Sequence, residues 1–157
     1  ESRPGNEGVR AAETLAAGGR RVTVCTDAAM APVCEASDVK SAVCGADAVW
    51  LVGDTAGELD VFVVNKTGTA LLALVAQRYA MRWCVCVDST KFMRLSTEEF
   101  EERKGQLESG PPEEIYREGP AGVHLEVFNP TFEAVRVDMA HISLVTEDGV
   151  LSYRQAL

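Results

Sequence analysis

The chain has 157 residues, of which 46% are hydrophobic and 25% are charged, and its formal net charge is −9. This length suits a domain with a core of its own, and the acidic balance argues against direct binding of nucleic acid through a broad basic face. The apolar runs are far too short to span a bilayer, and the N-terminus is polar, without the pattern of a signal peptide. We therefore expect a cytoplasmic globular protein with no membrane partner.

The first forty residues have the pattern of two helices with a strand between them. Residues 8–17 place small and apolar side chains at helical spacing, and a Gly-Gly pair stops that run. Residues 21–26 (RVTVCT) are rich in β-branched side chains, which favours a strand. Asp27 can cap a second helix over residues 28–36. The alternation of helix and strand favours an α/β fold.

The central stretch has the order strand, loop, helix, strand. Residues 41–45 (SAVCG) are a short apolar run typical of a buried strand, and residues 61–69 (VFVVNKTGT) are β-formers broken by polar residues. A helical pattern over residues 70–79 leads to a second apolar run, residues 82–88. Because this order is that of a parallel βαβ unit, we expect a Rossmann-like parallel β-sheet flanked by helices.

The remaining segments predict loops, one surface helix and short strands. Within residues 48–61, Gly53, Asp54 and Gly57 indicate a turn within a mobile loop. Residues 98–104 are charged and predict a surface helix, and residues 105–122 are rich in Gly and Pro, as in an exposed loop. Residues 124–128 alternate like an edge strand, and residues 150–153 predict a last short strand.

Polar side chains gather where the central strands end. Asp47 follows the first strand, and Asn65, Lys66 and Gly68 follow the second. In parallel sheets, ligands bind where strands end and helices begin, and a helix N-terminus with a nearby lysine attracts anions. We therefore predict that these four residues converge in one crevice that binds a phosphate or another acidic ligand. Asp47 can act there as a general acid or base, although a turn or helix-cap aspartate is an equally simple interpretation.

The cysteines and histidines do not have the spacing of a metal site. Cys44, Cys84 and Cys86 lie in strand-like runs, which fits reduced, buried thiols. The Cys84-x-Cys86 pair has no second pair at zinc-finger spacing, and His124 and His141 have no partner pattern. We expect neither a metal nor a cofactor.

Four motifs, in this order along the chain, resemble those of one superfamily. It comprises the alpha, beta and delta regulatory subunits of eukaryotic translation initiation factor 2B, their archaeal relatives, methylthioribose-1-phosphate isomerase and ribose-1,5-bisphosphate isomerase. The motifs are ESRPGNEGVR at residues 1–10, GAD at 45–47, NKTGT at 65–69, and NPTFE with TEDG at 129–133 and 146–149.

The resemblance implies the domain organisation and the partners. In the family the first of these motifs follows a helical N-terminal domain. Residues 1–157 would then be a single C-terminal Rossmann-like domain of a longer protein, without that helical domain. The family pairs through this half, so a homodimer or a complex with related regulatory subunits is expected. In the isomerases the residue that matches Asp47 works with a Cys of the N-terminal half, so this fragment alone is not expected to catalyse.

The resemblance also implies which residues bind a ligand. Asn65 and Lys66 match residues that contact the sugar phosphate in the isomerases, and Arg3 and Arg10 match residues near the same crevice. Surface salt bridging, which contributes little free energy, is the simpler role for those two arginines. Glu7 stands where the substrate-binding isomerases have Gln. A carboxylate there repels an anionic substrate, which speaks against turnover.

Two functions are therefore open. The first is a regulatory subunit-like domain of initiation factor 2B, the guanine-nucleotide exchange factor for initiation factor 2, acting by assembly and keeping a pocket for a phosphorylated sugar or nucleotide. Glu7 and the STKFM run at residues 89–93 favour it. The alternative is the C-terminal half of an aldose–ketose sugar-phosphate isomerase, which Asp47 favours. On the sequence alone, we prefer the regulatory function.

Overall fold

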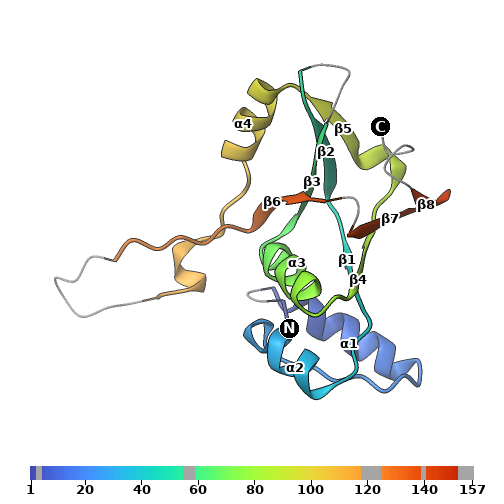
Figure 1. The fold of residues 1–157 in the computed structure, drawn as a ribbon. Helices are drawn as coiled ribbons and strands as arrows, with labels where there is room; N and C mark the ends of the chain where they lie inside the picture. Colours follow the sequence, from blue (N-terminus) through green and yellow to red (C-terminus); the bar gives the residue numbers. More distant parts are fainter. Residues whose placement is uncertain (3–4, 55–58, 118–124, 139–140, 152–157) are drawn as a thin grey trace. The chain divides into compact units, whose positions relative to one another are not determined.

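The structure is a computed structural model that describes residues 1–2, 5–54, 59–117, 125–138 and 141–151. The chain forms two compact units, residues 1–40 and residues 41–157. Helices and strands occur together along the chain (Figure 1), so the predicted α/β class is confirmed. No described helix is both long enough and apolar enough to cross a membrane.

The first unit holds the two predicted helices. They are α1 (Glu7–Ala17) and α2 (Met30–Ala36), the latter preceded by a short 3-10 turn, η1 (Asp27–Ala29). The predicted strand at residues 21–26 is wrong, since these residues form no strand. Their β-branched side chains favour an extended backbone, but a strand also needs a ladder partner, and none of the ladders between described strands includes them.

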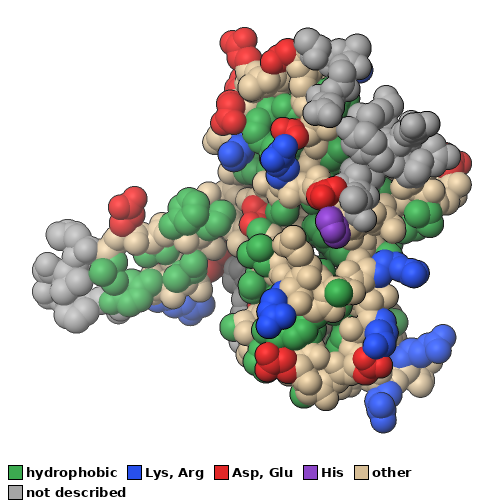
Figure 2. Space-filling view, in the orientation of Figure 1, with side chains coloured by type: hydrophobic (Ala, Val, Ile, Leu, Met, Phe, Trp, Pro, Cys, Tyr) green, Lys and Arg blue, Asp and Glu red, His purple; other side chains and the backbone are tan. Residues whose placement is uncertain are grey.

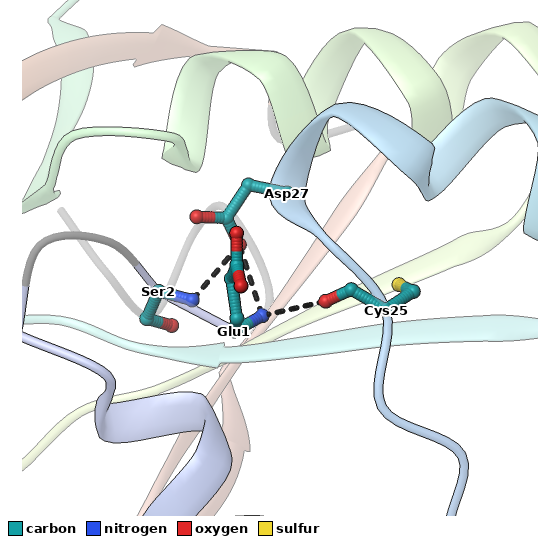
Figure 3. A network of polar contacts seen from close by, with 4 residues as sticks. All are labelled: Glu1, Ser2, Cys25 and Asp27. Atoms are coloured by element: carbon teal, nitrogen blue, oxygen red, sulfur yellow. Dashed lines mark hydrogen bonds and ion pairs between the residues drawn. The ribbon is translucent and has the colours of Figure 1, made fainter.

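The predicted helix cap by Asp27 is also wrong. No side-chain cap bond is made at the start of η1 or α2. The carboxylate of Asp27 instead accepts hydrogen bonds from the α-amino group of Glu1 at 3.1 Å and the amide of Ser2 at 2.9 Å, and the α-amino group also donates to the carbonyl of Cys25 (Figure 3). The aspartate therefore ties two segments of this unit together.

The second unit contains two four-stranded sheets. In the first sheet, of order β1-β4-β7-β8, the strands β1, β4 and β7 run parallel and β8 runs antiparallel. In the second sheet, of order β5-β2-β3-β6, only β2 and β5 run parallel. The strands are β1 (Ser41–Gly45), β2 (Ala48–Val52), β3 (Asp60–Lys66), β4 (Arg82–Cys86), β5 (Phe92–Leu95), β6 (Phe132–Val137), β7 (Ile142–Thr146) and β8 (Gly149–Leu151).

The predicted parallel βαβ arrangement is present only in part. Strands β1 and β4 are parallel neighbours. The strand between them, β3, does not join that sheet, and it pairs antiparallel with β2 and β6. This separation follows from β2, which the loop prediction for residues 48–61 missed. Val49 to Val52 are all buried. Strand β2 lies directly upstream of β3 and pairs with it as a hairpin, so β3 belongs to the second sheet and does not pair with β1.

Two helices pack on the sheets. Helix α3 (Thr69–Arg78) packs on β1 and β4 of the first sheet and on β6 of the second, and it buries Val75 and Ala76. Helix α4 (Thr97–Gly105) packs on β2 and β5, which confirms the predicted surface helix. It begins with a capping box between Ser96 and Glu99, and charged side chains cover its outer side (Figure 2).

An antiparallel bridge joins the two ends of the long segment between α4 and β6. Ser109 pairs with Pro130, and a short 3-10 turn, η3 (Pro112–Glu114), lies beyond that bridge. The predicted edge strand at residues 124–128 is wrong for residues 125–128, which form no strand, and His124 lies outside the described residues. The last predicted strand is present as β8, and residues 152 and 153 also lie outside the described residues.

Candidate functional site

The NKTGT segment forms a closed turn between β3 and α3. Gly68 has φ 110°, a conformation that glycine adopts with little strain. The side-chain amide of Asn65 donates to the hydroxyl of Thr69 at 3.0 Å, and that hydroxyl donates to the carbonyl of Lys66 at 2.8 Å. Thr69 is buried. The turn is therefore held by its own polar side chains before any ligand binds.

Asp47 lies beside Asn65 across the β2–β3 ladder. The ladder pairs Ala48 with Val64, and the amide of Asp47 donates to the carbonyl of Val64 at 2.9 Å. The carboxylate of Asp47 is exposed, and Asn65 is half-buried. Two predicted site residues that lie 18 positions apart in the sequence are thus neighbours at one end of the second sheet.

Lys66 occupies a different position from the one predicted. It is the last residue of β3, and alternation along a strand places its side chain on the face opposite that of Asn65. Its Nζ lies 5.8 Å from the centre of the Phe132 ring. Phe132 is the residue of β6 that pairs with Lys66 in the ladder. The structure brings Asp47, Asn65 and Gly68 together but directs the ammonium group of Lys66 elsewhere.

A different lysine reaches the Asp47 segment. The Nζ of Lys91, in the STKFM run, donates to the carbonyl of Ala46 at 2.9 Å. Ala46 is buried and directly precedes Asp47. Sequence reasoning assigned no site role to Lys91, because nothing local in the sequence signals a contact between residues 45 positions apart.

The N-terminus of α3 is already occupied by a carboxylate. The Oε1 atom of Glu133, in β6, accepts hydrogen bonds from the amides of Gly68 at 2.9 Å and Ala70 at 2.8 Å. Glu133 pairs with Asn65 in the β3–β6 ladder, so both side chains lie on the same face. The amides that we expected to meet a ligand anion are therefore bound within the protein.

The other two predicted ligand residues belong to the unit of residues 1–40. Glu7 is the first residue of α1, and its Oε1 lies 3.7 Å from Nη2 of Arg10, with the Arg10 side chain 66% exposed and that of Glu7 40% exposed. Such a pair contributes little to stability. Arg3 lies outside the described residues. Their predicted place in the ligand site stays a prediction.

The thiols of Cys44, Cys84 and Cys86 form no disulfide, and their burial differs from the prediction. Cys86 is exposed, whereas Cys44 and Cys84 are half-buried. Burial raises the pKa of the Cys44 thiol, and a hydrogen bond from the indole of Trp83 at 3.4 Å opposes that rise. Within the described ranges, no group of three or more His, Cys, Asp or Glu residues could hold a metal ion.

The TEDG motif lies at the edge of the first sheet where the parallel strands β1, β4 and β7 end. Glu147 accepts hydrogen bonds from the amide of Ser89 at 3.0 Å and from its hydroxyl. These bonds, with that of the Ser89 hydroxyl foremost, lower the pKa of Glu147. The motif therefore joins the turn after β7 to the segment that follows β4, which is a structural contact.

Comparison with known proteins places the chain in a family. A model of the initiation factor 2 subunit family matches residues 1–153. A methylthioribose-1-phosphate isomerase of Pseudomonas putida (strain GB-1) is 34% identical over 158 residues, which cover 96% of this chain and 40% of that protein. The chain therefore spans about two fifths of the length of the curated relatives that it matches.

Solved structures agree with this assignment. The delta subunit of translation initiation factor eIF-2B from A. fulgidus superposes with a TM-score of 0.74 at 26% identity, covering 97% of this chain and 42% of that one. The 5-methylthioribose 1-phosphate isomerase of Pyrococcus horikoshii OT3 shares the fold, with a TM-score of 0.64 at 22% identity over 88% of this chain and 36% of that one. Since the family model covers nearly the whole chain, the chain belongs to the initiation factor 2 subunit family.

Proposed function

We propose that this chain is the C-terminal part of an aldose–ketose isomerase that acts on a phosphorylated sugar of the methylthioribose-1-phosphate class. Curated relatives about one third identical to it carry the name methylthioribose-1-phosphate isomerase. This is the alternative that the sequence analysis ranked second. The names of these relatives, together with an aspartate at position 47, favour it over the regulatory function.

The observation that carries the proposal is the exposed Asp47, which the register of the β2–β3 ladder places next to Asn65. Isomerisation of an aldose to a ketose moves hydrogen between neighbouring carbons and protons between neighbouring oxygens. A positioned carboxylate can accept and return such a proton. An asparagine side chain offers both a donor and an acceptor to sugar hydroxyls, so the pair suits the uncharged part of a sugar phosphate.

The experiment uses the full-length protein that carries this sequence. Conversion of methylthioribose-1-phosphate is followed by NMR for the wild type and for Asp47→Asn, which keeps the side-chain size and removes the base. We expect kcat to fall about 10²–10⁴-fold, the usual contribution of a general acid or base, with KM little changed. Asp38→Asn is the matched control, because Asp38 is 83% exposed and lies in the other unit. A wild type without turnover, or an Asp47→Asn variant as active as the control, would overturn the proposal.

A regulatory subunit-like function is the second candidate. It is favoured by the higher TM-score of the delta subunit and by the position of Lys91, in the STKFM run, at the segment of Asp47. In that case the chain would pair with a second copy or with a related regulatory subunit, and would bind a phosphorylated sugar or nucleotide without converting it. Saturable binding of methylthioribose-1-phosphate without conversion, together with a dimer in sedimentation, would favour this function.

A further inference from the structure

We propose that Glu133 is a positioning residue that decides which end of a sugar phosphate this site accepts. Its carboxylate binds the amides of Gly68 and Ala70 at the positive end of α3. It therefore directs a ligand phosphate away from the turn between β3 and α3. The identity of the ligand rests on the proposed function. The exclusion of phosphate rests only on the geometry of Glu133.

The geometry is that of an anion-binding helix end with an anion built in. One carboxylate oxygen of Glu133 accepts from the amides of both Gly68 and Ala70. Helix α3 has ten residues, so its dipole is well developed at this end. Free amides at such a position attract phosphate groups. Here the amides are bound, and the bound carboxylate repels a second anion.

The turn is fixed to the segment before β6 by further bonds. The hydroxyl of Thr67 donates to the carbonyl of Pro130 at 2.6 Å, and the amide of Thr67 donates to the carbonyl of Thr131 at 3.0 Å. Together with the Asn65–Glu133 pair in the β3–β6 ladder, these contacts hold the carboxylate at the helix end. Glu133 is half-buried, which limits the screening of its charge by water.

The consequence concerns how the ligand lies. The face that carries Asn65 and Glu133, with Asp47 beside Asn65, offers acceptors and a side-chain amide, while the amides of Gly68 and Ala70 are bound by Glu133. Sugar hydroxyls donate to carboxylates and bind amides. The oxygens of an ionised phosphate only accept hydrogen bonds, so a carboxylate offers them nothing. The site therefore suits the hydroxyl-bearing carbons of the ligand, which is the part that isomerisation changes.

The test is a titration of the full-length, ¹⁵N-labelled protein with inorganic phosphate, read at the amides of Gly68 and Ala70. In the wild type these two signals should not shift. In Glu133→Ala the freed amides should shift saturably, and in Glu133→Gln, which keeps an acceptor oxygen but loses the charge, the shift should be detectable but weaker. Thr67→Val is the control, because it removes the bond to Pro130 without freeing either amide; it should leave both signals unshifted.

Each outcome decides the proposal. Saturable shifts of these amides in the wild type overturn it, and so do signals that stay unshifted in both Glu133 variants. If Glu133→Ala does not fold, the wild type and Glu133→Gln still decide. Because this titration needs no turnover, an inactive protein that gains phosphate binding would refute the proposed function and leave the role of Glu133 standing.

A kinetic signature separates positioning from a purely structural role. If Glu133→Ala lets the substrate phosphate bind at α3, part of the substrate binds the wrong way round. Such nonproductive binding lowers kcat and KM by the same factor and leaves kcat/KM unchanged. Loss of loop structure alone would lower kcat/KM instead, and that result would count against a positioning role.

Discussion

Phe100 should be among the residues that most stabilise the second sheet. Only 5% of its surface is exposed, and it packs in one cluster with Trp50, Val52, Val64 and Leu95. The centroid of its ring lies 4.3 Å from that of the Phe62 ring and 6.0 Å from that of the Trp50 ring, which it meets edge to face. Truncation of a buried phenylalanine costs about 3–5 kcal/mol, a range that already includes the loss of its contacts with neighbouring side chains. We expect Phe100→Ala to lower the free energy of unfolding by about 4 kcal/mol.

The matched control is Phe128→Ala, since the Phe128 side chain is 81% exposed. The same chemical change there should alter the free energy of unfolding by less than about 0.5 kcal/mol. Urea unfolding of the wild type and both variants, followed by circular dichroism and tryptophan fluorescence, measures the difference. Because a domain has only about 5–15 kcal/mol of stability, the contrast is large. Equal effects of the two substitutions would refute the assignment of this core.

The remaining predictions concern titration, thiol reactivity and the Asp47 segment. Because its pKa is lowered, Glu147 stabilises the fold through Ser89 at pH values above the ordinary carboxyl pKa, and this stabilisation is lost as the pH falls through the lowered pKa. Ser89→Ala should therefore raise the pKa of Glu147 in a ¹³C NMR titration. An unchanged pKa would contradict the contact. Cys44, half-buried and with a raised pKa, should be alkylated more slowly than the exposed Cys86 at mildly alkaline pH. The reverse order of modification, measured by mass spectrometry, would contradict this difference in burial. Lys91→Met removes the bond to Ala46 and should weaken binding of methylthioribose-1-phosphate several-fold, whereas an unchanged affinity would show that Lys91 has only a structural role.

Local chemistry predicted the elements whose signals lie within a few residues. The turn at residues 65–69 and helix α3 follow from a polar break and a glycine between apolar runs. The parallel pair of β1 and β4 follows from the order of the segments. Strand β2 was missed because strong turn residues directly follow AVWLV and outweighed an apolar run that itself fits a buried strand.

The long-range pairings could not be predicted from local signals. Strand β3 joins the second sheet through β6, and Asn65 lies opposite Glu133, far along the chain. A glutamate within a strand pattern gives no sign that its carboxylate binds a helix N-terminus 65 residues earlier. Phosphate binding at α3 was therefore a reasonable prediction from Gly68 and Lys66, and the occupied amides become visible only in the structure.

The central claim is that the end of the second sheet that carries Asp47 and Asn65 binds the sugar part of a phosphorylated sugar. The most direct measurement is a crystal structure of the full-length protein with methylthioribose-1-phosphate bound. Our account predicts a sugar oxygen within hydrogen-bonding distance of the Asp47 carboxylate, with Glu133 still bound to the amides of Gly68 and Ala70. A ligand phosphate seated on those amides, or a sugar bound away from Asp47, would contradict it.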